Sequence, residues 1–244
     1  MSDTNFKLET DADGIALITW DMPDRSMNVI TMGAIEELAA IVEKVAGDAA
    51  IKGAVITSGK DAFCGGADLT MLERFAALFA GMVKSQGEQA VAGMVFEESR
   101  KLSQLYRRLE TSGKPWVCAL NGTAMGGGFE IALACDLIVA SERAVFALPE
   151  PRVGLAALAG GVHRLPRQIG LKNAMGMLLT GRRVSAEEGL RLGFVNEVVA
   201  PGELAAAARR WADAICECAP LSVRASKQAA LQGLDAPSLR EAVD

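Results

Sequence analysis

The chain reads NGTAMGGGFEIALACD over residues 121–136, and this stretch is the strongest indication of how it folds and what it does. A short buried strand is predicted just before it, at residues 116–120. Gly126, Gly127 and Gly128 then open an amphipathic helix. Unpaired N–H groups at a helix start, with the positive end of the helix dipole, suit a developing negative charge. A glycine run can also serve only to let a helix pack closely on a strand, and the sequence leaves both interpretations open.

A second glycine turn lies upstream, where residues 63–68 read FCGGAD after another short apolar strand. The backbone N–H of Ala67 is a candidate partner for that of Gly127, because two such donors from two strand-to-helix turns form an oxyanion hole. Asp68 follows this turn, and we expect it to cap the next helix.

Two glutamates accompany these turns. Glu130 lies three residues after Gly127, so one helical turn presents a donor and a carboxylate on the same side. Glu150 follows Pro149, further along the chain. Taken singly, each fits a helix-dipole partner or an exposed side chain. Both flank apolar segments, however, and buried carboxylates are costly without a use, so the pair indicates proton transfer beside an oxyanion.

The composition excludes several other classes of function. The 244 residues are 50% apolar with a net charge of −5, and Lys and Arg are scattered, so no nucleic-acid surface is indicated. Five cysteines without a CxxC pair, and a single histidine, His163, favour neither a disulfide framework nor a metal site. We interpret His163 as structural. The polar start and the lack of a long apolar run predict a soluble, cytoplasmic protein that does not enter a membrane.

The hydrophobic pattern alternates strands with helices and then becomes helical, which predicts an α/β core with an all-α tail. Thr31 and Ser185 are the expected caps of two helices. We assign residues 1–200 to the core and 201–244 to a C-terminal helical region that is shortened. Strands are predicted at 6–10, 15–20, 52–58, 116–120, 137–140 and 144–147, and helices at 32–46, 68–111 with a break within 81–93, 126–135, 173–179, 185–192, 203–218 and 222–233.

In this order, the segments resemble the crotonase superfamily, the enoyl-CoA hydratase/isomerase family. The matching segments are residues 24–30, 54–59, 63–69, 114–115, 121–136, 146–150, 160–161, 164–167, 180–182 and 186–198, which together span nearly the whole chain. The resemblance implies a spiral of ββα turns whose helical C-terminal region builds homotrimers or homohexamers.

The resemblance also implies roles for particular residues. The N–H groups of Ala67 and Gly127 would form the oxyanion hole for a thioester carbonyl, and Glu130 and Glu150 would be the catalytic pair. The substrate-binding residues that it implies are Gly66, Asp68, Gly126, Leu148 and Gly154.

We therefore predict an enoyl-CoA hydratase of fatty acid metabolism that binds an acyl-CoA thioester and uses no metal or other cofactor, since coenzyme A is part of the substrate. Glu130 is expected mainly to orient and activate water, and Glu150 mainly to exchange the α-carbon proton. Three alternatives stay open: an enoyl-CoA isomerase, a specialised acyl-CoA dehydratase, and a CoA-ester-binding protein without turnover. Residues 158–165 read LAGGVHRL, which departs from the family's usual motif beside the acyl pocket, so the sequence leaves the acyl group undefined.

Overall fold

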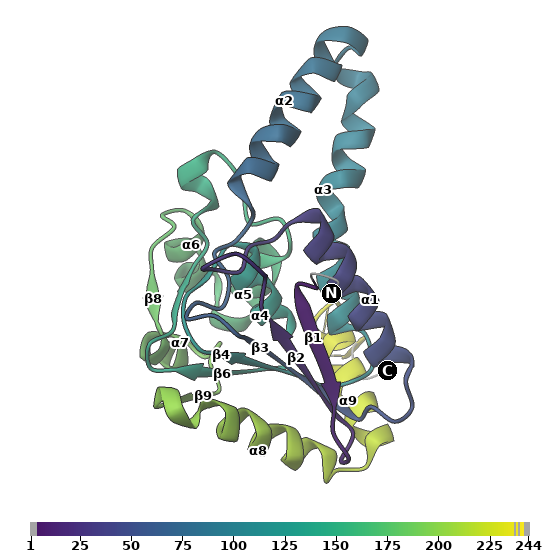
Figure 1. Ribbon diagram of the computed structural model, residues 1–244, viewed down its shortest axis with the longest axis vertical. Coiled ribbons are helices and arrows are strands. Elements are labelled where there is room, and N and C mark those ends of the chain that lie inside the picture. The colour runs from purple at the N-terminus through teal and green to yellow at the C-terminus, as the bar shows by residue number, and fades with distance from the viewer. Residues whose placement is uncertain (1–3, 237, 239, 242–244) are drawn as a thin grey trace.

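The computed structural model describes residues 4–236, 238, 240 and 241, and its centre is a six-stranded sheet (Figure 1). The strand order is β1-β2-β3-β4-β6-β9, in which β1 and β2 form an antiparallel pair and the others are parallel. The strands are β1 (Phe6–Thr10), β2 (Ile15–Trp20), β3 (Gly53–Ser58), β4 (Trp116–Leu120), β6 (Leu137–Ser141) and β9 (Glu197–Val199). All but β9 were predicted within one residue at each end, because each is a short apolar run bounded by turn residues.

A second, three-stranded sheet has the order β5-β7-β8. Its members are β5 (Ala124–Met125), β7 (Val145–Ala147) and β8 (Val184–Ser185). The pairing of β5 with β7 places the chain just before the glycine run beside the chain just before Glu150. Segments that are distant in sequence therefore reach the same place through this small sheet.

The helices agree with the predicted pattern except in one region. Thr31 Oγ1 accepts the N–H of Ala34 at 3.2 Å, and Ser185 Oγ accepts that of Glu188 at 3.2 Å, so both predicted caps are confirmed. The helix at residues 161–169 was not predicted. The helices are α1 (Met32–Gly47), α2 (Leu69–Gln86), α3 (Glu88–Glu110), α4 (Gly127–Ala134), α5 (Gly161–Ile169), α6 (Leu171–Leu178), α7 (Ala186–Leu192), α8 (Leu204–Cys216) and α9 (Pro220–Gly233), with short 3-10 turns at Glu150–Val153 and Pro201–Glu203.

Each face of the large sheet has its own apolar core, because side chains alternate along a strand. On one face, Ile56 and Cys118 pack with α1, the end of α3 and α4. On the other face, Val55 and Ala119 pack against α8. A cavity of about 550 Å³ lies under α8 on this second face, and neither Glu130 nor Glu150 lines it.

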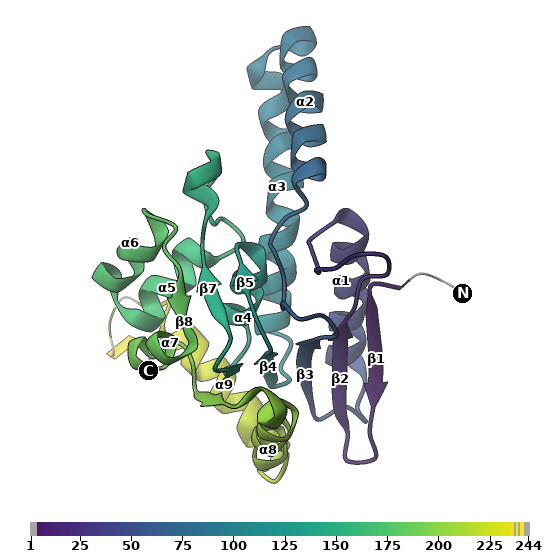
Figure 2. The same ribbon diagram turned by 60° about the vertical axis from the view of Figure 1, so that its left-hand side comes forward.

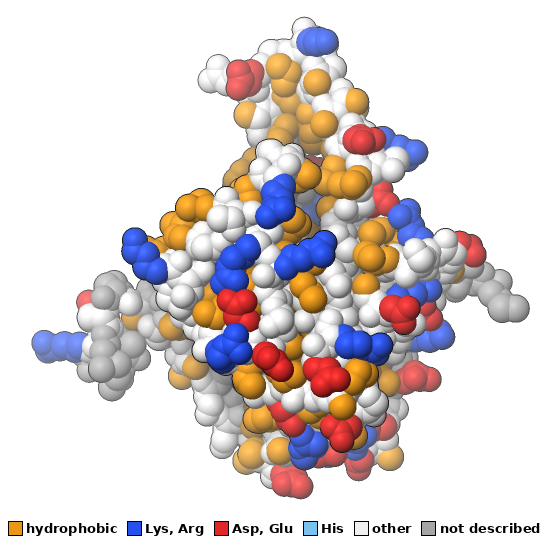
Figure 3. Space-filling model, turned by 90° about the vertical axis from the view of Figure 1, so that its left-hand side faces the viewer, with side chains coloured by type: hydrophobic (Ala, Val, Ile, Leu, Met, Phe, Trp, Pro, Cys, Tyr) orange, Lys and Arg blue, Asp and Glu red, His pale blue; other side chains and the backbone are white. Residues whose placement is uncertain are grey.

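Helices α2 and α3 form a hairpin that projects from the body (Figures 1 and 2). The break falls at Gly87, whose φ of 85° suits glycine, and this lies within the predicted interval. No residue of α2 is buried, whereas the last turns of α3 are anchored in the core through Leu105, Tyr106 and Leu109. Apolar side chains remain exposed along the hairpin, Phe96 among them. Figure 3 shows apolar side chains on the hairpin above a hollow where the hairpin meets the body.

Candidate active site

The two glycine turns meet, as the sequence predicted. The N–H of Met125 donates to the carbonyl of Cys64 at 2.9 Å, and the N–H of Phe63 donates to that of Thr123 at 2.9 Å. The two turns also stay close after these hydrogen bonds, since a Cβ atom on Gly66 would lie 3.1 Å from the carbonyl oxygen of Met125. The turn after β3 and the turn before α4 thus form one rigid unit.

The N–H groups of this unit that lack an acceptor in the part of the chain that the structure describes include those of Ala67 and Gly127. The N–H of Ile30 donates to the carbonyl of Gly66 at 2.8 Å, and the carbonyl of Ile30 accepts the N–H of Asp68 at 3.0 Å. The N–H of Ala67, between these two residues, takes no part in either bond. Gly127 is the first residue of α4, where an N–H has no intrahelical acceptor. Unpaired donors in adjacent turns fit the oxyanion hole that the sequence predicts, and that role stays a prediction here.

The glycine run permits close packing, which is one of the two interpretations that the sequence left open. Gly126 has φ 52° and ψ −127°, and a Cβ there would lie 2.7 Å from Glu150 Oε1. A Cβ on Gly128 would lie 2.5 Å from that of Cys64, so this glycine permits close packing of the two turns. Conformational freedom is needed at the first position and space at the last.

Glu130 is almost completely buried, with 3% of its surface exposed. Its Oε1 accepts the N–H of Gly161, the first residue of α5, at 2.8 Å. Burial raises the pKa of Glu130 to about 7; the Gly161 N–H opposes this rise, and the neighbouring charge of Glu150 adds to it. The side chain is therefore fixed in place and is able to exchange a proton near neutral pH.

Glu150 lies at the first position of a 3-10 turn, with its carboxyl group directed at the glycine run. Its Oε1 borders Gly126, and its Oε2 is buried with no hydrogen-bond partner among the described residues. Burial raises the pKa of Glu150 as well. An unpartnered carboxyl oxygen beside two free N–H groups is available for a proton or a reacting atom.

The other predicted residues are distributed around this centre. Leu148 is fully buried and contacts the start of α5, where a Cβ on Gly161 would lie 3.1 Å from its Cδ1. Gly154 ends the 3-10 turn with φ 75° and is exposed. Asp68 caps α2 through the N–H of Met71 at 2.9 Å and pairs with Arg25 at 2.7 Å, so the predicted cap is confirmed. Both oxygens of Asp68 have partners in the protein, and its binding of substrate stays a prediction.

Comparison with known proteins now decides the family. A family model described as enoyl-CoA hydratase/isomerase matches residues 10–244. The chain belongs to this family. Its expected α/β fold is confirmed by a putative enoyl-CoA hydratase from Streptomyces coelicolor A3(2), with a TM-score of 0.86 and 29% identity over 99% of this chain and 83% of that one. An enoyl-CoA hydratase from Bacillus anthracis has a TM-score of 0.83 and 30% identity over 98% and 86% of the two chains.

Curated members of the family include hydratases for quite different acyl groups. The chain is 39% identical to (E)-benzylidenesuccinyl-CoA hydratase of Thauera aromatica, over 91% of this chain and 81% of that protein. It is 32% identical to the short-chain-enoyl-CoA hydratase of Clostridium acetobutylicum, over 90% and 78%. The fatty acid oxidation complex subunit alpha of Shewanella frigidimarina is 37% identical over 80% of this chain, which spans only 26% of that protein.

Sequence reasoning missed the part of this family site that comes from α5. Pro166 lies inside this helix, and an internal proline disfavours a helix prediction. The apolar spacing of Gly161, Leu165 and Ile169, all buried, was the available signal. His163 lies on the exposed face of α5, and its structural role stays a prediction.

The described residues contain no group of three or more His, Cys, Asp or Glu side chains that could hold a metal ion. None of their helices is both long enough and apolar enough to span a bilayer.

Proposed function

We propose that this protein is an enoyl-CoA hydratase that adds water reversibly across the double bond of a 2-enoyl-CoA thioester. The observation that carries the proposal is the pair Glu130 and Glu150, one buried and one half-buried glutamate with raised pKa values, near the N–H groups of Ala67 and Gly127, for which the described residues offer no acceptor. The family acts on acyl-CoA thioesters.

The proposed reaction uses these groups as follows. The thioester carbonyl oxygen accepts the two N–H bonds, which stabilise the negative charge that develops as an enolate. Glu130, held by Gly161, takes a proton from water while the hydroxyl adds to the β-carbon, and protonated Glu150 delivers a proton to the α-carbon. Dehydration is the same path reversed. The charge of Glu150 adds to the rise in the pKa of Glu130, because two neighbouring carboxyl groups disfavour the state in which both are ionised.

In this mechanism, backbone N–H groups polarise the thioester carbonyl, and the carboxyl groups of Glu130 and Glu150 transfer the protons. We therefore propose that it requires no metal or redox cofactor. By analogy with the family we also propose a homotrimer or homohexamer, which sedimentation equilibrium of the purified protein would test.

The decisive experiment is a turnover assay with 2-enoyl-CoA esters that range from crotonyl to aryl-substituted acyl groups, in which hydration removes the conjugated absorbance. We expect Glu130→Gln and Glu150→Gln to lower kcat by about 10²- to 10⁴-fold with little change in KM. The matched control is Glu73→Gln, a change at an exposed residue of α2.

Two of the alternatives have their own signature in this assay. Uptake of deuterium from heavy water into product without net addition of water would identify an isomerase. Binding of acyl-CoA esters without turnover of any ester in the panel would identify a non-catalytic protein. Full hydratase activity in either glutamate variant would remove that residue from its proposed role.

A further inference from the structure

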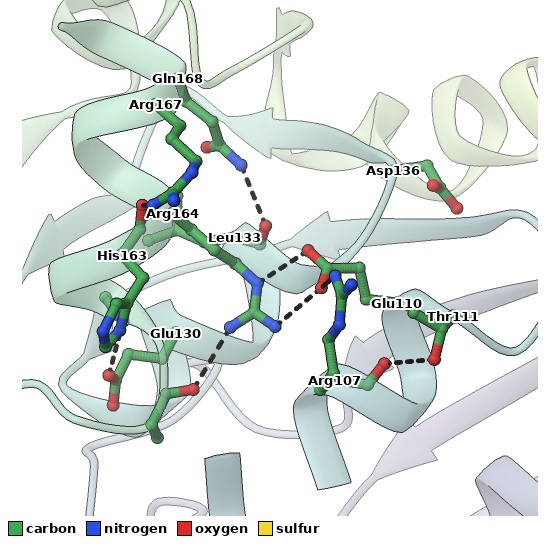
Figure 4. A network of polar contacts seen from close by, with 12 residues as sticks. Arg107, Glu110, Thr111, Glu130, Leu133, Asp136, His163, Arg164, Arg167 and Gln168 are labelled. Atoms are coloured by element: carbon green, nitrogen blue, oxygen red, sulfur yellow. Dashed lines mark hydrogen bonds and ion pairs between the residues drawn. The ribbon is translucent and has the colours of Figure 1, made fainter. Parts of the chain in front are cut away.

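The last turns of α3 contact both halves of the candidate site. The Tyr106 hydroxyl, fully buried, donates to the carbonyl of Gly127 at 2.9 Å, next to one free N–H. One turn later, Glu110 Oε1 and Oε2 accept from Nε and Nη2 of Arg164 at 2.9 Å and 3.0 Å. Figure 4 shows the Arg164 guanidinium reaching from α5 to Glu110. Both side chains of this ion pair are only 12% exposed.

Arg164 in turn contacts the segment that binds Glu130. Its Nη1 donates to the carbonyl of Ala159 at 3.3 Å. The Arg164 guanidinium occupies the space that a side chain at residue 160 would need, since a Cβ on Gly160, which has φ 125°, would lie 1.8 Å from Nη1. The next residue, Gly161, donates its N–H to Glu130. Arg164 therefore joins the end of α3 to the peptide that orients Glu130.

We propose that Arg164 and Glu110 are a positioning pair, which holds the Gly161 N–H on the Glu130 carboxylate without touching the substrate. The inference rests on the proposed function, in which Glu130 activates water. A two-bond contact between a guanidinium and a carboxylate fixes both distance and plane, which a single contact does not. The pair would set the orientation of the Glu130 carboxyl group through the Gly161 N–H. Small displacements of a catalytic carboxyl group reduce the reaction rate strongly.

The same contacts favour the ionised form of Glu130. The Gly161 N–H and the Arg164 charge lower its pKa, while burial and the Glu150 charge raise it. The Tyr106 hydroxyl also lies near Glu130, and burial raises its pKa well above the ordinary value, so it stays neutral. Loss of Arg164 should therefore raise the pKa of Glu130 and move the acidic limb of the rate profile to higher pH.

The test compares Arg164→Lys, Arg164→Gln and Glu110→Gln in the full-length protein. Arg164→Lys keeps the charge but loses the two-bond contact, so we expect kcat to fall at least about tenfold with KM changed less than about twofold. Arg164→Gln should in addition raise the acidic limb of kcat/KM by about one pH unit. The control is Arg167→Gln, because Arg167 is exposed on the same helix and donates to the carbonyl of His163.

A second readout does not depend on activity. The ¹³C NMR titration of side-chain carboxyl groups, with the Glu130 signal assigned by its loss in Glu130→Gln, should show the same upward shift in Arg164→Gln. This signal would move even if the substrate were a different CoA ester, so failure of the proposed function is distinguishable from failure of the positioning role. The inference is overturned if Arg164→Lys keeps the kcat and pH profile of the wild type, or if lost activity matches only the fraction of unfolded protein.

Discussion

Replacing Glu130 with Gln should stabilise the folded protein at alkaline pH while it abolishes most activity. The carboxyl group has a pKa near 7 in the folded protein against an ordinary 4.5, because it is buried with 3% of its surface exposed. Gln has nearly the same shape, and its Oε1 can still accept the N–H of Gly161. The substitution therefore removes chiefly the cost of ionising a buried group.

The magnitude follows from the shift in pKa. A change from 4.5 to about 7, at 1.36 kcal/mol per unit, corresponds to about 3 kcal/mol. Below about pH 4.5 the group is protonated in both states and contributes nothing to the difference. Between about pH 4.5 and pH 7 it ionises in the unfolded chain only, so the wild type loses stability as the pH rises. Above about pH 7 the penalty is constant.

Urea unfolding monitored by tryptophan fluorescence, at fixed protein concentration and at a series of pH values, gives the free energy of unfolding of each protein. The value for Glu130→Gln minus that for the wild type should rise by about 3 kcal/mol between about pH 4.5 and pH 8. Any pH-independent effect of the Gln side chain on the free energy of unfolding is the same at both pH values, so it cancels in this difference. Glu73→Gln should give a flat difference. A flat or falling difference for Glu130→Gln would refute the burial argument.

Three further substitutions test the geometry. Gly126→Ala should cost about 1–3 kcal/mol of stability and lower kcat/KM about 100-fold, because it strains the backbone and displaces Glu150, as denaturation and initial-rate assays would show. Tyr106→Phe should lower the free energy of unfolding by about 1–3 kcal/mol, since the carbonyl of Gly127 loses its buried donor. Asp68→Ala should cost about 0.5–2 kcal/mol through loss of the α2 cap, measurable as a lower midpoint in urea.

Each of these predictions has its own control and its own contrary result. Gly81→Ala, at a helix position with open space around the added methyl group, is the control for Gly126→Ala and should not reduce stability. Wild-type kcat/KM in Gly126→Ala would show that Glu150 is not displaced. Unchanged stability in Tyr106→Phe would mean that water replaces the lost donor. For Asp68, the variant Asp68→Asn should retain most of the cap, and equal losses in both would contradict capping.

The sequence by itself determined the elements whose signals are local. Strands at residues 15–20 and 116–120 follow from short apolar runs between turn residues, and the Thr31 cap follows from a hydroxyl at the start of a periodic helix. The two glycine turns and the helix-capping Asp68 were also recognisable, because backbone freedom and capping depend on a few neighbouring residues.

Only the tertiary structure decided what depends on distant partners. Strands β8 and β9 are too short to carry a pattern and exist through their pairing. The helix α5 begins at Gly161 with no side-chain cap of its own, and its first N–H is satisfied by Glu130. The link between Arg164 and Glu110 joins residues 54 positions apart. The pKa of Glu130 belongs in the same group, because desolvation is produced by the packed surroundings and not by the residues adjacent in the chain.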